Sequence, residues 1–380
     1  MMHLAFLTPE YPHPFSTPSG GLGTSIRNLA EKLSKKGERI TIFVYGQMHY
    51  KIFEERGINF HYIKQRNYPF LGWWFHRKFL EKYINRVIKE QKIDVLEGPD
   101  WTGITAFMDI KCPVIIRLHG SDSYFCRLEN RPQKKKNFWF EKFALAGADE
   151  LLSVSQFTAQ KTAEIFNIKR EIKVIPNSID VNIFKPTGEN VIPGRILYFG
   201  SIIRKKGVLE LVEIFSYISK KNPEARLLMA GRDVIDVETQ KSTRELFLEK
   251  LPKELVVNVQ WLGTLAPMQV REEISRATVI VLPSFAEALP MAWLEAMAME
   301  KAMVTSNVGW AEEIMIDGKT GFTVHPTNHE LYAKKVLKLL NDPELASGMG
   351  KAARNQVILQ FSSEVVVEKN LRFYRSIIGK

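Results

Sequence analysis

The sequence predicts an α/β protein with two doubly wound domains, and three observations support this prediction. Short apolar runs that end in Gly, Pro, Ser or His alternate with longer stretches of helical spacing, as is typical of parallel strands joined by crossover helices. The length of 380 residues exceeds the usual size of one domain. Turn residues cluster in Pro176-Asn177-Ser178-Ile179-Asp180 and Lys185-Pro186-Thr187-Gly188, just before a fresh strand. We therefore expect the domain boundary near residue 180.

The expected elements follow from these runs. Strands are predicted in the first half at residues 4–7, 40–45, 114–118, 151–154 and 173–175, and in the second half at 195–199, 226–230, 256–262, 278–282 and 302–305. Helical spacing is clearest at 21–36 and 208–220, and Ser362-Ser363-Glu364 caps a final helical pattern. The expected domains are residues 1–180 and 181–360, followed by a helix at 361–380. Ligands of such sheets bind at the carboxyl ends of the strands.

Composition narrows the class of protein. A hydrophobic share of 45% with 25% charged residues is ordinary for a globular chain and excludes disorder as its dominant state. The net charge is +11, and residues 1–190 hold 28 basic against 20 acidic residues, so the first half is expected to meet something anionic. The only cysteines, Cys112 and Cys126, form no CxxC pair, which favours a reducing compartment. Neither a signal peptide nor an apolar run of spanning length is recognised, so a cytoplasmic location is expected, with peripheral attachment to the inner face of the membrane as a further hypothesis.

The first candidate site is Ser19-Gly20-Gly21-Leu22-Gly23, which follows a strand and opens a helix. Glycines let backbone amides approach a ligand, and a helix N-terminus favours negative charge, so the segment predicts a phosphate-facing loop. A simple tight turn is the alternative. The dinucleotide-binding motif Gly-x-Gly-x-x-Gly would begin at Gly21, but Ile26 stands in place of its last glycine. Gly318-Lys319-Thr320 lacks the upstream glycine of a P-loop. These departures argue against hydride transfer and P-loop NTPase activity.

Two further candidates lie in the second half. Arg204, Lys205 and Lys206 follow a strand and precede Gly207, which suits a diphosphate, although a solvated run of cations is the alternative. Glu295 lies inside an apolar helical segment, where a carboxylate is costly unless it is paired or hydrogen-bonded. It is expected either to accept hydrogen bonds from ligand hydroxyls or to pair with a neighbouring cation. Glu287 precedes it in a loop, and Pro290 suits the first turn of the helix.

Glu287 and Glu295 match an E-x7-E signature, and at this point the chain resembles a known family. It is similar to the retaining GT-B glycosyltransferases of the glycosyl-transferases group 1 family, which move sugars from nucleotide-sugar donors. The resemblance covers nearly the whole chain and includes, in order, Gly20-Gly21, His119-Gly120, Pro176-Asn177-Ser178-Ile179-Asp180, Phe184-Lys185-Pro186, Lys206-Gly207, Val308-Gly309, Glu313 and Asp317-Gly318-Lys319-Thr320-Gly321. It implies two Rossmann-like domains that face a central cleft, the first for the acceptor and the second for the nucleotide sugar, with the final helix crossing back to the first.

The resemblance also implies roles. Arg204 and Lys206 would hold the donor diphosphate, Glu295 would accept ribose hydroxyls, and His119 would face the transferred sugar. The Gly20-Gly21 loop would close over the phosphates. The implied catalytic residues are Arg204, Lys206, Glu287 and His119, and the implied donor-binding residues are Gly20, Gly21, Ser201, Arg204, Lys206, Glu287, Ala288, Leu289, Pro290 and Glu295.

Three positions depart from the family pattern. Ser201 stands where the family often has Arg, so Arg204 would have to bind the donor phosphate in its place. Pro290 removes one amide donor, and Trp310 replaces a common second glycine, which would narrow the donor pocket. The pair Asp233 and Asp236 has the wrong spacing for an Asp-x-Asp metal motif, and no metal requirement is expected.

Basic, aromatic stretches occur at residues 68–79 and 134–140. Cations beside Trp and Phe suit an anionic membrane surface, whereas the alternative is a packed aromatic core under a solvated charged face. Nucleic acid is a weaker alternative, because no recognised binding module accompanies the charge.

Taken with the resemblance, the sequence predicts a retaining, metal-independent hexosyltransferase. It would use a UDP- or GDP-sugar and no cofactor, and would act on a glycan, lipid-linked or small-molecule acceptor in bacterial cell-surface polysaccharide or glycolipid synthesis. The alternatives are a GT-B protein that binds nucleotide sugar without transferring it, or a GT-B epimerase or phosphorylase.

Overall fold

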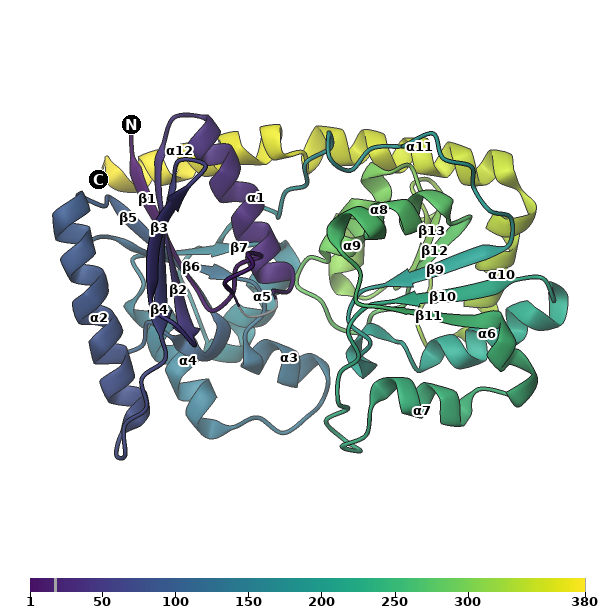
Figure 1. Ribbon diagram of the computed structural model, residues 1–380, viewed down its shortest axis with the longest axis horizontal. Helices are drawn as coiled ribbons and strands as arrows, with labels where there is room; N and C mark the ends of the chain where they lie inside the picture. Colours follow the sequence, from purple (N-terminus) through teal and green to yellow (C-terminus); the bar gives the residue numbers. More distant parts are fainter. Residues whose placement is uncertain (17–18, 380) are drawn as a thin grey trace. The chain divides into compact units, whose positions relative to one another are not determined.

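The structure, a computed structural model that describes residues 1–16 and 19–379, contains two compact units (Figure 1). Unit 1 comprises Met1–Ser178 and Ser363–Lys380, and unit 2 comprises Ile179–Ser362. Each unit holds one sheet with helices on its faces, so the predicted α/β class with two doubly wound domains is confirmed. The change from unit 1 to unit 2 falls two residues before the expected boundary at 180, and the final helix belongs to unit 1.

The sheet of unit 1 has the order β3-β4-β2-β1-β5-β6-β7-β8. Its strands are β1 His3–Thr8, β2 Arg39–Gln47, β3 Lys51–Glu55, β4 Ile58–Lys64, β5 Val95–Pro99, β6 Val114–Leu118, β7 Glu150–Ser153 and β8 Lys173–Val174. Every neighbouring pair is parallel except β3 with β4, a hairpin closed by Arg56 and Gly57, whose φ angles are 54° and 71°. Two consecutive residues with positive φ are the mark of a tight hairpin turn. The strands β3, β4 and β5 were not predicted from the sequence.

Helices cover both faces of this sheet. They are α1 Gly21–Lys35, α2 Gly72–Gln91, α3 Asp122–Leu128, α4 Lys135–Gly147, α5 Gln156–Phe166 and α12 Ser363–Ile378, with a short 3-10 segment at Trp101–Gly103. On one face, α1 and α12 pack together on apolar residues of β1, β2 and β4. On the other face, α2 buries Leu80, Ile84 and Val87 against Leu7 and Phe43 of the sheet. Burial on both faces explains why the central strands are continuous apolar runs.

A buried polar network ties the last helix to the sheet of unit 1. Arg117 of β6 donates to both carboxylate oxygens of Glu97 of β5, at 2.7 and 2.9 Å. Asn370 and Tyr374 of α12 complete the network, because Arg117 also donates to the Asn370 side chain and the Tyr374 hydroxyl donates to Glu97 at 2.8 Å. A buried ion pair needs such additional partners to offset its desolvation. The network therefore fixes α12 on unit 1.

The sheet of unit 2 is parallel throughout, in the order β11-β10-β9-β12-β13-β14. Its strands are β9 Arg195–Phe199, β10 Arg226–Ala230, β11 Val259–Gly263, β12 Val279–Leu282, β13 Met303–Thr305 and β14 Phe322–Thr323. Its α-helices are α6 Glu210–Lys221, α7 Thr243–Lys250, α8 Pro267–Arg276, α9 Met291–Ala298, α10 His329–Asn341 and α11 Pro343–Gln360, and 3-10 segments span Arg204–Lys206, Lys253–Asn258 and Gly309–Glu313. The strand expected from residue 256 begins only at Val259, because the 3-10 segment extends to Asn258.

Across residues 1–16 and 19–379, none of the helices has the length and apolar character needed to cross a membrane.

Candidate functional site

The candidate site of unit 2 lies at the carboxyl ends of β9, β10 and β12. The strand order reverses between β9 and β12, which is the position where open parallel sheets bind ligands. The loop after β9 packs tightly on the loop after β12: a side chain at Gly207 (φ 68°) would meet the carbonyl oxygen of Pro283 at 1.9 Å, and the amide of Phe285 donates to the carbonyl of Lys205 at 2.8 Å. Glycine is therefore required at 207 by this close approach of two backbones.

Lys206 and Glu287 are brought together in this site. Lys206 Nζ lies 3.1 Å from Glu287 Oε1, and the same oxygen accepts a hydrogen bond from the Ser284 hydroxyl at 3.2 Å. The Lys206 and Glu287 side chains are 22% and 13% exposed. The hydroxyl of the buried Tyr198 donates to the carbonyl of Ser201 at 2.7 Å. The pKa of Tyr198 is raised, mainly by burial and to a smaller extent by the charge of Glu287. The site thus holds an ammonium and a carboxylate, both partly open to solvent.

Arg204 is held by acidic side chains of the loop after β10. Its Nε and one terminal nitrogen donate to the two carboxylate oxygens of Asp236, both at 2.8 Å, and Glu238 lies 3.3 Å from the guanidinium. The hydrogen bond to Arg204, together with two from Thr239, lowers the pKa of Asp236 to about 2. Such a bidentate pair fixes the plane of a guanidinium. Sequence reasoning missed Asp236 as a partner of Arg204, since only the pairing of β9 with β10 brings their loops together.

Arg232 is a second residue that sequence reasoning missed. The pairing of β9 with β10 continues past the strands, because the amide of Ile202 donates to the carbonyl of Arg232 at 2.9 Å and Ile202 bridges Asp233 in parallel. This register sets Ser201 opposite Arg232. Arg232 is exposed. Arg232 therefore lies opposite Ser201, the position at which the family often has an arginine.

The remaining predicted donor residues lie at the start of α9. Ala288 and Leu289 are buried, and Pro290 is the residue just before the helix rather than part of its first turn, since α9 begins at Met291. Glu295 lies within α9 and is only partly buried, although most of its helix is fully buried. Trp310, in the 3-10 segment Gly309–Glu313, is fully buried. The two glutamates thus come from the loop and the helix that follow β12.

The candidate site of unit 1 is centred on His119, which follows β6. Asp100, fully buried after β5, accepts the backbone amides of His119 and Gly120 at 3.0 and 3.1 Å. Burial raises the pKa of Asp100 to about 7, and burial with the charge of Arg117 lowers the pKa of His119 to about 3. His119 is therefore a neutral imidazole at physiological pH and can exchange hydrogen bonds without carrying charge.

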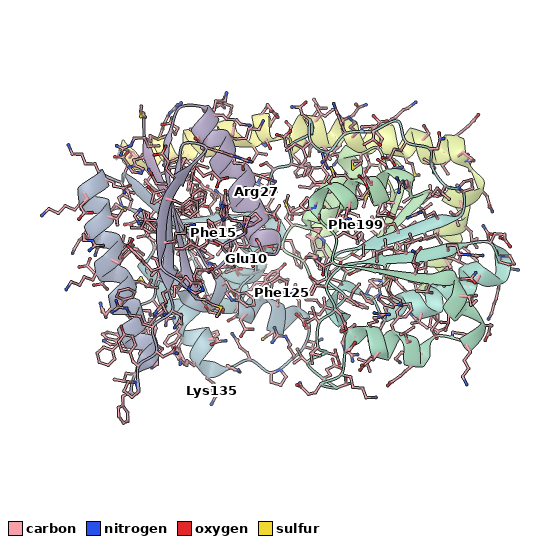
Figure 2. All side chains as sticks on the ribbon, viewed as in Figure 1. Glu10, Phe15, Arg27, Phe125, Lys135 and Phe199 are labelled. Atoms are coloured by element: carbon pink, nitrogen blue, oxygen red, sulfur yellow. The ribbon has the colours of Figure 1, made fainter. Side chains whose placement is uncertain are left out.

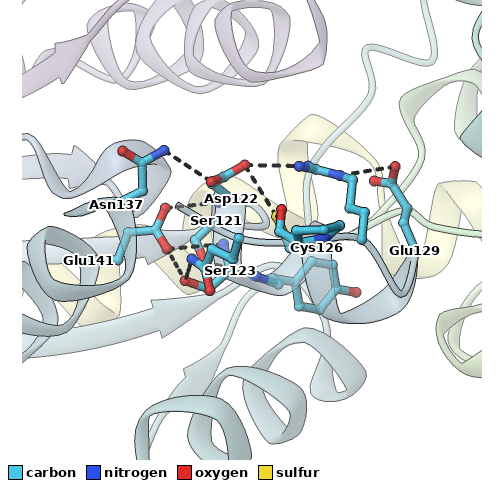
Figure 3. Close-up of polar contacts among 11 residues, drawn as sticks. Ser121, Asp122, Ser123, Cys126, Glu129, Asn137 and Glu141 are labelled. Atoms are coloured by element: carbon cyan, nitrogen blue, oxygen red, sulfur yellow. Dashed lines mark hydrogen bonds and ion pairs between the residues drawn. The ribbon is translucent and has the colours of Figure 1, made fainter. Parts of the chain in front are cut away.

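The turn after His119 is fixed from the other side by Glu141 of α4 (Figure 3). Its carboxylate accepts the amides of Asp122 and Ser123 at 2.9 and 3.1 Å and the Ser123 hydroxyl, while the Ser121 hydroxyl caps α3 by accepting the amide of Tyr124. Glu141 is fully buried, and burial raises its pKa. The segment that carries His119 is thus held by two buried carboxylates, Asp100 and Glu141.

The backbone amides of the Gly20–Gly23 loop of unit 1 are already bonded to a carboxylate, that of Glu10. One carboxylate oxygen of Glu10 accepts the backbone amides of Gly20 and Gly23, each at 2.9 Å, at the start of α1 (Glu10 is labelled in Figure 2). A helix N-terminus favours such a negative group. Space is open around Gly21, where an added side-chain carbon would meet no atom within 4 Å. A phosphate at this loop would therefore approach Gly21 or displace Glu10.

Across the part of the chain that the structure describes, no three or more His, Cys, Asp and Glu side chains are grouped as a metal site would require.

Comparisons with known proteins agree with this fold. Residues 181–356 match the family model of Glycosyl transferases group 1, and residues 19–183 match that of Glycosyltransferase Family 4. Among solved structures, sucrose-phosphate synthase from Thermosynechococcus elongatus superposes with a TM-score of 0.82 at 18% identity, covering 100% of both chains. HepE from Anabaena, solved in complex with UDP-glucose, has a TM-score of 0.77 at 16% identity, covering 99% of this chain and 100% of its own. These likenesses show the GT-B fold of two Rossmann-like domains.

Two curated relatives illustrate the sequence similarity. The chain is 30% identical over 278 residues to alpha-maltose-1-phosphate synthase of Mycobacterium tuberculosis, covering 65% of this chain and 70% of that protein. It is 26% identical over 265 residues to the capsular polysaccharide biosynthesis glycosyltransferase CapM of Staphylococcus aureus, covering 63% of this chain and 65% of CapM. Each match thus spans about two thirds of the relative's length. On these findings the chain is a glycosyltransferase that belongs to the glycosyl transferases group 1 family.

Proposed function

We propose that this glycosyltransferase transfers a hexose, with retention of anomeric configuration and without a metal, from a UDP- or GDP-sugar to a glycan or lipid-linked acceptor. Unit 2 would bind the donor and unit 1 the acceptor. The observation that carries the proposal is the cluster of Lys206, Glu287 and Arg204 at the β9–β12 edge of unit 2. The structure of HepE with UDP-glucose supports the choice of donor class, and the similarity to CapM, a capsular polysaccharide biosynthesis glycosyltransferase, supports a role in the synthesis of a cell-surface polysaccharide.

The donor diphosphate would be held by the cations of this edge. Lys206 exchanges the Glu287 carboxylate for a phosphate oxygen, Arg232 contributes a second positive charge beside Ser201, and Arg204 is oriented by Asp236. Preorganised donors of this kind are each worth about 3 kcal/mol where charge develops in a transition state. They would therefore stabilise the diphosphate as it leaves, in place of a metal ion.

The transfer step exchanges one glycosidic bond for another. The bond between the anomeric carbon and the diphosphate oxygen breaks, and the acceptor oxygen bonds to the same face of that carbon. The acceptor proton passes to the leaving phosphate. Glu295 would accept ribose hydroxyls, and Glu287 with the Ala288–Leu289–Pro290 segment would bind the sugar and phosphate. His119, which is neutral, would serve as a hydrogen-bonding partner of the sugar rather than as a cation.

A direct test incubates the protein with UDP-glucose, UDP-N-acetylglucosamine and GDP-mannose, with a lipid or glycan acceptor and EDTA, and measures released nucleoside diphosphate. NMR of the product then reports its anomeric configuration. We expect release from at least one donor in EDTA, with retention. Binding without any release would favour the nucleotide-sugar-binding alternative, and an altered sugar still attached to its nucleotide would favour the epimerase.

The role of Arg232 is tested separately. Arg232→Ala should weaken UDP binding about tenfold to a hundredfold, which corresponds to the loss of one charged hydrogen bond. The matched control is Arg244→Ala, which removes another guanidinium of unit 2, one that lies 5.1 Å from the ring centre of Trp261. Equal UDP affinity in both variants would remove Arg232 from the donor site and leave the rest of the proposal standing.

A further inference from the structure

The basic, aromatic stretches near residues 70 and 140 meet at one edge of unit 1. Ring contacts run from Trp74 of α2 to Phe107 at 5.6 Å, from Phe107 to Phe143 of α4 at 5.0 Å, and from Phe143 to Trp139 at 5.8 Å. We call this surface the aromatic edge; its exposed apolar members are Phe70 (79% exposed), Leu71 (59%), Phe75 (46%), Phe107 (36%), Trp139 (49%) and Phe143 (44%). The exposed part that these ring contacts join, Phe107, Phe143 and Trp139, is contiguous, and exposed apolar surface of this kind marks an interaction site.

Only part of the aromatic content belongs to the core. Trp73 and Phe140 pack against each other at 4.9 Å, with Phe140 buried, so the core alternative holds for these two rings. In contrast, Leu71 and Phe107 are exposed although their backbones have positive φ angles of 46° and 65°. This left-handed conformation costs a residue with a side chain about 1 kcal/mol. The chain thus keeps large apolar groups exposed at strained positions.

Lysines surround the aromatic edge. Lys142 Nζ lies 5.2 Å from the ring of Trp139, and Lys136 Nζ lies 5.8 Å from that of Trp73. Lys135 begins α4 and Lys134 directly precedes it (Lys135 is labelled in Figure 2). Residues 134–143 contain one acid, Glu141, and it is buried and bonded to Ser123. The charge that this segment exposes is therefore positive.

The aromatic edge lies at the carboxyl end of its sheet. In a parallel α/β sheet, a helix that follows a strand begins where that strand ends. The first turn of α2 follows β4, and α3 and α4 follow β6. His119 also follows β6, so the aromatic edge and the candidate site of unit 1 share one end of the sheet.

We propose that the aromatic edge docks on the anionic headgroup surface of a lipid membrane, with its rings in the interface and its lysines on the headgroups. Aromatic side chains interleaved with lysines fit such a surface, because the rings enter the boundary region while the ammonium groups meet the anionic lipids. A second copy of this chain is a poorer occupant, since a two-fold contact would bring two copies of the same positively charged edge together. Docking here presents the end of unit 1 that carries His119 to a lipid-linked acceptor.

The test is flotation of the full chain with vesicles of phosphatidylcholine alone, and of phosphatidylcholine and phosphatidylglycerol in equal amounts, at low and high salt. No sugar nucleotide is added, so the result is independent of the proposed function. We expect flotation with the mixed vesicles at low salt and its loss at high salt. Lys135→Gln with Lys142→Gln should lower the partition coefficient about 25-fold, because each lysine near an anionic surface contributes about fivefold.

The matched control is Lys35→Gln with Lys89→Gln, which removes the same charge from the last turns of α1 and α2, at the other end of the sheet. It should float as the unaltered protein does. Phe70→Ala with Trp139→Ala should also lose binding, and because Phe70 is 79% and Trp139 49% exposed, its Tm should fall by a few degrees at most.

Three outcomes would overturn the proposal. One is the absence of the protein from the mixed vesicles at low salt, and another is equal loss of binding in the lysine variant and its control. The third is a stable dimer, seen by light scattering without vesicles, that Trp139→Ala dissociates. That dimer would assign the aromatic edge to a second copy.

Discussion

Replacing Lys206 with Met tests the chemistry assigned to the β9–β12 edge of unit 2. The substitution keeps most of the side-chain volume and removes the ammonium that lies 3.1 Å from Glu287. Because Lys206 is assigned to the developing charge of the leaving diphosphate, its loss should cost about 3 kcal/mol in the transition state, or about a hundredfold in kcat. The effect on folding should be much smaller. The pair is partly open to solvent, so its loss should change the free energy of unfolding by about 1 kcal/mol or less.

The assay is steady-state release of nucleoside diphosphate, measured beside thermal unfolding. Lys241→Met is the matched control, because Lys241 forms a similar ion pair with Glu249 at 2.8 Å on the surface of unit 2. We expect a shift in Tm of a few degrees at most in both variants, and a fall in kcat only for Lys206→Met. If Lys206→Met turns over as fast as the unaltered protein, or if both variants slow equally, the assignment of Lys206 is wrong.

Three other predictions follow from buried or paired charges. Asp236→Asn removes the carboxylate that orients Arg204, and KM for the donor should rise about tenfold; an unchanged KM would show that this pair has no part in binding. Arg117→Met leaves Glu97 buried without its cation and should cost about 3–5 kcal/mol in urea unfolding, whereas the further change Glu97→Leu should restore most of it; equal losses would contradict the ion-pair account. Asp100 has a pKa of about 7 when folded, against a usual 3.8, so the folded chain keeps a proton that the unfolded chain releases, and stability should fall as pH rises through that window. Asp100→Asn should remove this loss of stability with rising pH. If the free energy of urea unfolding changes with pH in the same way in Asp100→Asn and in the unaltered protein, the role of Asp100 is refuted.

The strands at the candidate site of unit 2 could be predicted from sequence because they are buried on both faces. The runs at 195–199, 226–230 and 278–282 are continuous and apolar, and the structure has β9, β10 and β12 there. The strand β5 was missed because Glu97, Gly98 and Pro99 interrupt its apolar pattern, although it is buried. The strand β3 was missed because it is a mostly exposed edge strand, and the largely buried β4 was missed because Asn59 and His61 interrupt its apolar run. Burial on both faces reveals a strand in the sequence only where the run of residues is also apolar throughout.

Partners across the sheet left no local signal in the sequence. Asp236 reaches Arg204, and Arg232 stands opposite Ser201, only because β10 lies beside β9 in the strand order. Glu10 and Asp100 were missed for a different reason. Their carboxylates accept backbone amides, and an amide donor has no residue type that a motif could record.

The most direct test of the central claim is calorimetric titration of the protein with UDP and with UMP, and with GDP and GMP. The claim is that the cations at the β9–β12 edge of unit 2 bind the donor through its diphosphate. We expect one base to be preferred, its diphosphate to bind at least about tenfold more tightly than its monophosphate, and Lys206→Met to reduce that difference about tenfold. Equal binding of diphosphate and monophosphate, or a difference that is undiminished in Lys206→Met, would contradict the claim.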